Sequence, residues 1–571
     1  MPSHACLGTM ASVSLLRTTL RVAGKSSLAA ATGGAAYGAY LYETDEGFVR
    51  MVQAYSTFIP VVIHYRWAEF RQDKLGQTVD WEAMDDYYAS HTVSKLGELQ
   101  GMYCKYGQTA AGFTNTFGDA WIKEFRKLEN EVPPRSVEVV QKTIEEETGK
   151  PADSTFSEFD PVPLGSASIG QVHRARLKTN GKVVAVKVQY PEAQELFQED
   201  MHTIRSFCEL LAPEHVVVLS ALEKQNEAEL DYRNEAQNLL EVHSNMQKHG
   251  FLPREVVVPL PLPELTTSRI LVMDLIEGPK LVDGIRAYFA KYAEQHGTTL
   301  HDLEEEMRDK IEREGIPAKY DGPSAWKIAL YRKSLVVWDR LINCGVGIFN
   351  GFVGTFISKD RKLPYQQSTL PPNIPQIIDT LMRVHGYQLM KDGTFNSDPH
   401  GGNFILMKDG RIGLIDYGAT KRLDENERQS ACLLFAALAR RDEQKLFDMC
   451  EIGGYKSKYN KRDVLMKLLL FGYDSWGKDV TGGMNIQQFI DKLKKEDPWE
   501  EVPDNFVMAQ FMSIRLRSLA LGMNHPVKCS DWWGPMAEAF LEEEGHPYNS
   551  WDYDKMMANK PKLNMQKYKF A

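Results

Sequence analysis

The residues best suited to chemistry are two aspartates and an asparagine between positions 394 and 418. Asp398 is followed five positions later by Asn403, and Asp416 begins the triplet Asp-Tyr-Gly. Phosphoryl transfer uses such a set, because one carboxylate lies near the attacking oxygen while an amide and a second carboxylate hold the bridging metal ions. Asp, Asn and Gly are also common in ordinary turns, so a purely structural loop is the alternative for this segment taken alone.

His400 lies two residues after Asp398. We expect it to position or protonate a phosphate oxygen, and a hydrogen bond within the loop is the alternative. The dipeptide before Asp398 is Asn396-Ser397, in place of the His-Arg that precedes the catalytic aspartate of protein kinases.

A second block predicts a β-hairpin with a phosphate-binding loop. Asn180-Gly181 separates two β-rich runs, which is a strong hairpin signal. The first run follows the glycine-rich loop of protein kinases, with Ala in place of the second Gly, and the second run ends in Val-Ala-Val-Lys. The loop positions are Gly165, Ala167, Gly170 and Val172, and the lysine is Lys187.

The lysine needs an acidic partner on a helix. Residues 226–240 predict an acidic helix in which Glu235 is flanked by Ala236 and Leu239, and most of its other acids are expected on a solvated face. The apolar run 269–278 predicts a buried strand that leads into an inter-lobe connection, where we expect Asp274 and Ile276 to line a nucleotide site. The chain order of these blocks predicts a kinase-like fold of the α+β class.

Around this centre the chain divides into five parts. We expect a targeting or membrane segment (1–42), a helical extension (43–150), a small lobe (151–278), a mostly helical large lobe (279–545) with an insertion at about 285–373, and a tail (546–571). In the extension, Lys105-Tyr106-Gly107-Gln108 puts a glycine into an otherwise good helix. Since Gly costs about 1 kcal/mol relative to Ala there, a close approach is expected.

Composition narrows the classes of function. The chain has 571 residues and a net charge of -10, which argues against a nucleic-acid partner. Its seven cysteines include no Cys-x-x-Cys pair, which argues against a zinc ribbon and a disulfide framework. The first 42 residues are basic and contain no acid, as in organelle transit peptides. We expect association with the mitochondrial inner membrane, with a plastid as the alternative.

The insertion holds a charged helix (303–314) and then the uncharged run 341–358. We expect this run to form a core helix, and contact with a bilayer is the alternative.

Together these blocks resemble the UbiB/AarF-type atypical kinases. The resemblance spans about 87–440, apart from the insertion. It lies in the Lys-x-Gly-Gln helix, the loop Ser-Ala-Ser-Ile-Gly-Gln-Val-His, the strand Val-Ala-Val-Lys, the helix Glu-Leu-Asp-Tyr-Arg-Asn-Glu, and the pair Asp-Pro-His-Gly-Gly-Asn and Asp-Tyr-Gly.

The resemblance implies a bilobal protein-kinase-like fold whose Lys-x-Gly-Gln helix folds over the site. It implies that Gly107 permits a close approach to the nucleotide pocket. The implied roles are a nucleotide lysine and its partner (Lys187, Glu235), a catalytic aspartate (Asp398), metal ligands (Asn403, Asp416) and a gate (Lys105, Gln108, Glu229, Asp231).

The function that the resemblance implies is an atypical kinase or ATPase using ATP and Mg²⁺ in isoprenoid-quinone biosynthesis or lipid homeostasis. The implied partners are a lipid or quinone precursor, a membrane surface and lipid-biosynthesis enzymes. One alternative is a protein kinase acting in trans, against which the Lys-x-Gly-Gln helix argues. The other is a non-catalytic nucleotide-binding scaffold, against which the complete set of site residues argues.

Overall fold

A computed structural model describes residues 37–111, 118–130, 133–211, 219–220, 223, 226–315, 325–352, 362–366, 368, 371–484, 486–502, 504–558 and 568–569. Most of the predicted targeting segment, residues 1–36, therefore lies outside the described residues. Among the described residues, no helix combines the length and the apolar character that crossing a membrane requires.

The small lobe is a five-stranded antiparallel sheet in the order β1-β3-β4-β6, with β2 paired to β3. The register of the β3–β4 hairpin places Val172 opposite Lys187. Alternate residues of the sheet pack against α6 (Val137–Thr148). The strands are β1 (Phe156–Phe159), β2 (Gly165–Ser166), β3 (Gly170–Leu177), β4 (Val183–Gln189) and β6 (Ile270–Asp274).

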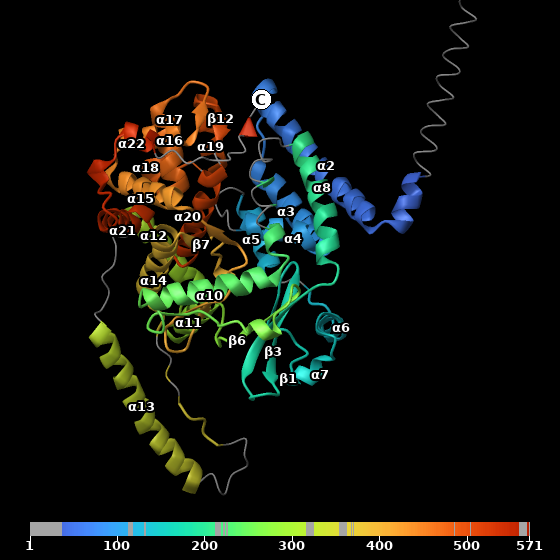
Figure 1. Ribbon diagram of the computed structural model, residues 1–571, viewed down its shortest axis with the longest axis vertical. Helices are drawn as coiled ribbons and strands as arrows, with labels where there is room; N and C mark the ends of the chain where they lie inside the picture. The colour runs from blue at the N-terminus through green and yellow to red at the C-terminus, as the bar shows by residue number, and fades with distance from the viewer. Residues whose placement is uncertain are drawn as a thin grey trace, which may run out of the picture.

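A layer of helices lies on one side of this lobe (Figure 1). Leu128 and Phe125 of α5 pack with Cys104 of α4 and Val93 of α3 in one small core. A second core joins α4 and α8 through Met102, Phe197 and Met201. These helices are α2 (Glu46–Leu75), α3 (Trp81–Leu99), α4 (Gly101–Ala111), α5 (Asp119–Asn130) and α8 (Ala193–Leu211), and the short α7 (Ala152–Thr155) precedes β1.

The large lobe is mostly helical, and its main core includes Trp532 and Trp533. Three small sheets belong to the described part of this lobe. In the first, β8 pairs with β9, which also pairs in parallel with β5, and in the second β7 pairs with β10. In the third, β12 (Trp499–Val502) pairs with β11 (Lys456–Ser457) and β13 (Tyr568–Lys569). The strands are β5 (Val256–Val257), β7 (Thr394–Asn396), β8 (Phe404–Leu406), β9 (Ile412–Leu414) and β10 (Thr420–Arg422). The main helices are α11 (Leu281–Gln295), α12 (Leu300–Glu314), α14 (Ile374–Tyr387), α15 (Glu425–Arg440), α16 (Glu443–Gly453), α17 (Arg462–Leu469), α19 (Ile486–Glu496), α20 (Asp504–Gly522) and α21 (Cys529–Glu543).

Helix α10 (Tyr232–Lys248) joins the two lobes. Glu235 reaches the small lobe, where it bonds to Lys187, and Asn238 donates to the carbonyl of Tyr417 at 2.8 Å in the large lobe. The bond from Asn238 ties the helix to the Asp-Tyr-Gly triplet. The predicted α+β class is confirmed, with a small lobe built on a sheet and a mostly helical large lobe.

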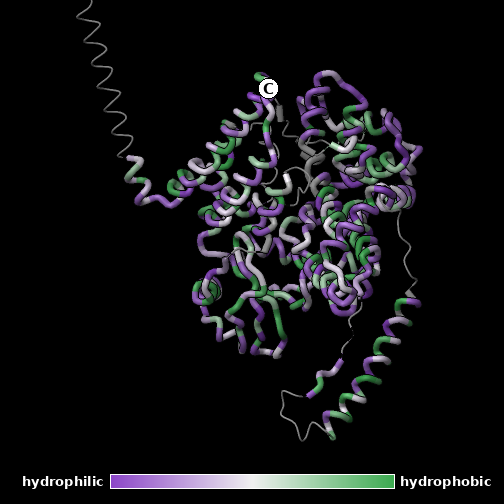
Figure 2. The backbone as a smooth tube through the Cα atoms, turned by 180° about the vertical axis from the view of Figure 1, so that it is seen from behind, coloured by the Kyte–Doolittle hydropathy of each residue, from purple (hydrophilic) through white to green (hydrophobic). Residues whose placement is uncertain are grey.

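Helix α13 (Ala325–Phe352) contradicts the expectation of a core helix between 341 and 358. Leu341 and Ile348 are 65% and 60% exposed. The helix extends away from the body of the molecule, and Figure 2 shows hydrophobic residues along it. An uncharged run gives no information about whether another element covers it, and residues 353–358 lie outside the described part.

Candidate active site

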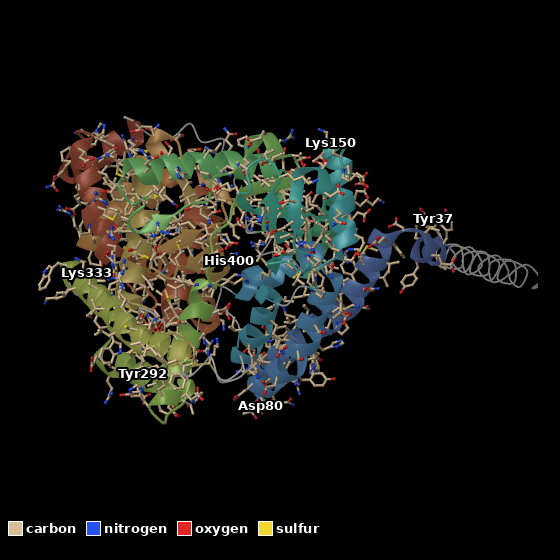
Figure 3. All side chains as sticks on the ribbon, turned by 90° about the horizontal axis from the view of Figure 1, so that it is seen from below. Tyr37, Asp80, Lys150, Tyr292, Lys333 and His400 are labelled. Carbon is tan, nitrogen blue, oxygen red and sulfur yellow. The ribbon has the colours of Figure 1, made fainter. Side chains whose placement is uncertain are left out.

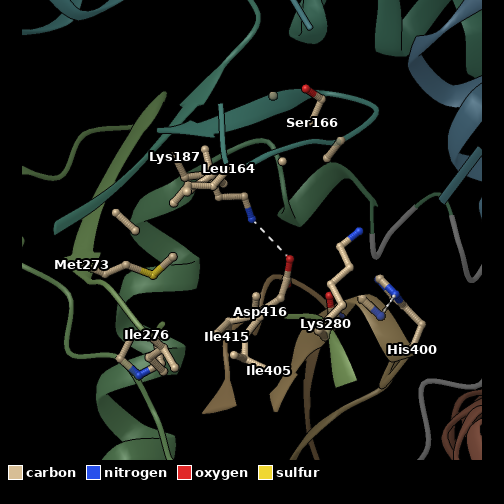
Figure 4. Close-up of a pocket in the computed structure, with 18 of the residues that line it drawn as sticks. Leu164, Ser166, Lys187, Met273, Ile276, Lys280, His400, Ile405, Ile415 and Asp416 are labelled. Atoms are coloured by element: carbon tan, nitrogen blue, oxygen red, sulfur yellow. Dashed lines mark hydrogen bonds and ion pairs between the residues drawn. The ribbon is translucent and has the colours of Figure 1, made fainter. Parts of the chain in front are cut away.

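A cavity of about 770 Å³ lies between the two lobes. It is lined by the β2–β3 turn, the end of β6, the loop before β8 and the residues after β9 (Figure 4). Figure 3 shows His400, one of its lining residues, near the middle of the molecule. Fifteen predicted site residues line this cavity: Lys105, Gln108, Gly165, Ala167, Gly170, Val172, Lys187, Glu229, Glu235, Asp274, Ile276, Asp398, His400, Asn403 and Asp416.

Lys187 lies between two carboxylates. Its Nζ is 2.8 Å from Glu235 Oε2 and 3.3 Å from Asp416 Oδ2. Burial lowers the pKa of Lys187, but Asp416 and Glu235 outweigh it and hold the pKa well above its ordinary value. Burial raises the pKa of Glu235 to about 7, with Lys187 opposing it. The ammonium is therefore fixed where it can neutralise phosphate oxygens.

The β8–β9 hairpin brings Asn403 and Asp416 together, although thirteen positions separate them in the sequence. Phe404 is opposite Leu414, and the Ile415 N–H donates to the Asn403 carbonyl at 3.1 Å. Asp416 Oδ1 accepts the Gly418 N–H at 3.0 Å. Burial raises the pKa of Asp416, but Lys187 and the Gly418 N–H reverse this, so the pKa is lowered and the group stays ionised.

Asp398 is paired with Arg515 from α20, a residue whose site role was not predicted from the sequence. Arg515 Nε is 2.9 Å from Asp398 Oδ1, and the arginine side chain is 6% exposed. Burial by itself would raise the pKa of Asp398, but Arg515, followed by His400 and Lys105, outweighs burial and lowers it. The run Arg-Leu-Arg-Ser-Leu at 515–519 is typical of a helix and does not indicate which of its two arginines, both buried in the structure, contacts Asp398.

His400 accepts a hydrogen bond from the Gly402 N–H through Nδ1 at 3.2 Å. This is the bond within the loop that the sequence left as the alternative. The ring also lines the cavity beside Lys280 (Figure 4), so a contact with a phosphate stays a prediction.

The gate residues divide into two groups. Lys105 forms an ion pair with Glu229, and both side chains are 15% exposed. Gln108 lines the cavity and donates to the Leu128 carbonyl at 2.8 Å. Asp231 does not line the cavity.

Asp231 instead caps α10 through the Arg233 N–H and pairs with the Arg233 side chain. This differs from the expectation that Asp231 belongs to the gate with Lys105 and Gln108. Asp is a preferred N-cap residue, and that local role is the one it takes here.

The expectation for Gly107 is also corrected. A Cβ at this position would lie 2.3 Å from Leu128 Cδ1, so the close approach is to α5 and not to the nucleotide pocket. Gly170 lies close to the neighbouring strand β4, because a Cβ there would lie 2.6 Å from the Val188 carbonyl oxygen, and its part in phosphate binding stays a prediction.

The donor set suits Mg²⁺ held jointly with phosphates. Mg²⁺ is commonly bound by one or two carboxylates together with phosphate oxygens and water. Asp416 and Asn403 supply one carboxylate and one amide at the same cavity. Within the described residues there is no cluster of three or more His, Cys, Asp or Glu that could hold a metal ion.

The chain is similar to known atypical kinases. The family described as the ABC1 atypical kinase-like domain matches residues 127–311 and 364–450. An uncharacterized aarF domain-containing protein kinase of Arabidopsis thaliana, named as chloroplastic, is 35% identical over 33% of this chain and 27% of its own length. "Probable protein kinase UbiB" of Shewanella woodyi is 34% identical over 33% of this chain and 35% of its own length. AarF domain-containing protein kinase 1 of Mus musculus is 30% identical over 48% of this chain and 53% of its own length. The chain thus covers about a quarter to a half of these relatives.

Proposed function

Because the chain belongs to the UbiB/AarF family of atypical kinases, we propose that it binds Mg-ATP between its lobes and transfers the γ-phosphoryl group to water or to a small lipid-like acceptor. The observation that carries the proposal is the meeting of Lys187, Glu235 and Asp416 with Asp398 and Asn403 around one cavity.

Each residue has a defined part in this proposal. Lys187, oriented by Glu235, neutralises phosphate oxygens, and the N–H groups of the β2–β3 turn lie over them. Asn403 and Asp416 would hold Mg²⁺, which neutralises the charge that develops on the phosphates. Asp398 orients the attacking oxygen and accepts its proton. Its lowered pKa favours orientation over strong basicity.

The acceptor is proposed to be small. Lys105 and Gln108 of α4 line the same cavity as Asp398, so a helix of the N-terminal extension forms part of the cavity wall near the proposed catalytic aspartate. This supports water, a phenolic lipid or a quinone precursor over a folded protein as the acceptor. We propose a role in isoprenoid-quinone biosynthesis or lipid homeostasis at the mitochondrial inner membrane, with a plastid as the alternative.

The experiment follows phosphate release from labelled ATP with Mg²⁺, in the presence of vesicles, a phenolic lipid or a mixture of peptides. Release stimulated by vesicles or the phenolic lipid, with no label on peptides, supports the proposal. Label on peptides favours a protein kinase acting in trans. Nucleotide-dependent thermal stabilisation without any turnover favours a non-catalytic scaffold.

A further inference from the structure

Helix α13 carries an exposed apolar stripe. Trp326, Leu330, Val337, Leu341 and Ile348 are 64%, 60%, 54%, 65% and 60% exposed. With 3.6 residues per turn these five positions fall on one side of the helix. Most large apolar side chains on soluble proteins are covered, so a continuous exposed patch of this kind marks an interaction surface.

The opposite side of α13 is covered by the chain that returns from the helix. Asn343 donates to the Gln366 carbonyl at 2.7 Å, and Asn350 donates to the Leu363 carbonyl at 2.9 Å. The carboxylate of Asp339 accepts from the N–H and hydroxyl of Ser368 at 2.7 and 2.6 Å. The polar side of α13 therefore bonds to the returning segment of the same chain, and the apolar stripe faces away from that segment.

The spacing of the stripe fits a flat surface. Trp326, Val337 and Ile348 repeat every eleven residues, and so do Leu330 and Leu341. Eleven residues are close to three turns, so the stripe runs almost straight along the helix. This repeat excludes a left-handed coiled coil, which needs a seven-residue repeat, and it leaves a flat surface and a right-handed helix pair to be distinguished by the charge on α13. From Trp326 to Ile348 the stripe extends about 33 Å along the helix.

The charge on α13 distinguishes between a second copy of the helix and an anionic membrane as the partner of the stripe. It has four basic residues, Lys327, Arg332, Lys333 and Arg340, while its single acid, Asp339, is bonded to Ser368. The whole chain has a net charge of -10. A second α13 against the stripe would bring like charges together, whereas anionic headgroups complement them.

We propose that α13 is a docking helix that lies in the headgroup region of an anionic membrane, with the stripe turned toward the acyl chains. Interfacial helices combine basic residues with Trp, Phe and Leu on the apolar face, and Trp prefers the membrane–water interface. The inference deepens the proposed function, on which it rests for the idea of a lipid-like acceptor.

The docking helix contacts the catalytic hairpin. Arg332 donates to the carbonyl of Asp409 at 2.6 Å, in the turn between β8 and β9. The two ends of that hairpin carry Asn403 and Asp416. Docking through α13 would therefore hold the β8–β9 hairpin, which carries the proposed metal ligands, close to the membrane.

The test is flotation of the full chain with vesicles, without nucleotide. Vesicles of phosphatidylcholine alone are compared with vesicles that also contain phosphatidylglycerol. The variant Val337→Gln/Leu341→Gln removes apolar surface from the stripe, and Leu210→Gln is the matched control, because Leu210 is 75% exposed on α8. Equal thermal unfolding temperatures exclude an effect through folding, as expected for exposed positions.

The proposal expects wild type and Leu210→Gln to bind the anionic vesicles, and the double variant to bind them at least about tenfold less tightly. Equal binding by all three proteins, no vesicle binding by wild type, or equal binding to both kinds of vesicle would overturn it.

Self-association of wild type that the double variant abolishes, without vesicle binding, would assign the stripe to a second copy of this chain. Phosphate release measured without vesicles should be unchanged in the double variant. Vesicle binding by a wild type that neither hydrolyses ATP nor transfers labelled phosphate to lipid would refute the proposed function and leave the docking helix standing.

Discussion

Arg515 Nε lies 2.9 Å from Asp398 Oδ1, so an arginine from α20 directly contacts the proposed catalytic carboxylate. Arg515 is the first among the neighbours that lower the pKa of Asp398 against the effect of burial. Because Arg515 lowers its pKa, Asp398 is ionised over a wide pH range and is at the same time a weaker base. This balance suits slow hydrolysis or transfer to an acceptor that needs orientation more than deprotonation.

Replacing Arg515 should move the acid limb of the pH–rate profile. In Arg515→Gln the guanidinium no longer opposes burial, so the pKa of Asp398 rises and activity is lost at a higher pH than in wild type, by about 1–3 pH units. The matched control is Arg517→Gln, because Arg517 is buried on the same helix but donates to the carbonyls of Phe471 and Gly472. The control should lower the unfolding temperature and leave the acid limb in place. An acid limb unchanged in Arg515→Gln would contradict the assigned role.

Nucleotide affinity should rise with pH across a transition near 7. The pKa of Glu235 is raised to about 7 by burial, with Lys187 opposing, while the pKa of Lys187 stays well above its ordinary value. Below the transition Glu235 is protonated and neutral, and above it the carboxylate pairs fully with Lys187. Calorimetric titration with Mg-ATP at a series of pH values measures this.

Glu235→Gln serves as the control for that titration, because any pH dependence that it retains belongs to the nucleotide. We expect it to bind about tenfold more weakly than wild type at high pH, a difference of about 1.4 kcal/mol. The same pH dependence in both proteins would refute the assignment.

The pair between Lys105 and Glu229 should contribute to the docking of α4. Both side chains are largely buried, so removing either partner deletes an ion pair from a largely buried position, and we expect a cost of about 1–3 kcal/mol in the free energy of unfolding. In a double-mutant cycle, Lys105→Met and Glu229→Gln together should cost about 0.5–3 kcal/mol less than the sum of the single changes. The more exposed pair Lys95–Glu98 on α3 is the control, with an expected coupling below about 1 kcal/mol. A coupling energy of zero at Lys105–Glu229 would contradict this role.

Gly107→Ala should destabilise the helical extension. The added Cβ overlaps Leu128 Cδ1, which costs about 1–3 kcal/mol by overpacking and exceeds the gain of about 1 kcal/mol in helix propensity. In a Leu128→Ala background the overlap is absent, and the same substitution should become stabilising. Gly345→Ala on α13 is the control, since nothing lies within 4 Å of its Cβ position. Chemical denaturation gives the free energies, and a destabilisation that persists without Leu128 would show that the explanation is wrong.

Much of the candidate site follows from the sequence because its residues belong to short local patterns. Lys187 follows from a strand pattern, and Asn403 and Asp416 flank a hairpin, so chain order alone predicts that they share a pocket. Gln108 and Lys105 were found through the resemblance, since nothing in a lone helix gives those residue types a task. The kinase-like fold is confirmed, whereas the roles of the site residues stay predictions.

The remaining features depend on contacts between distant segments. Arg515 reaches Asp398 only through the packing of α20 in the large lobe, and sequence periodicity does not distinguish it from Arg517. The neighbour of Gly107 is set by how α4 crosses α5. The exposure of Leu341 and Ile348 depends on the absence of a covering element among the described residues, which an apolar run cannot indicate.

The central claim is that one cavity binds Mg-ATP through Lys187, Asn403 and Asp416. Its most direct test is Mg²⁺-dependent ATP binding and hydrolysis by wild type, Asp416→Asn and the control Asp409→Asn, whose carboxylate lies in the β8–β9 turn and bonds to Arg411. We predict that wild type and Asp409→Asn bind and hydrolyse Mg-ATP, and that Asp416→Asn retains its fold and loses hydrolysis by about a hundredfold or more. Hydrolysis by Asp416→Asn at the wild-type rate, or a wild type that binds no nucleotide, would contradict the account.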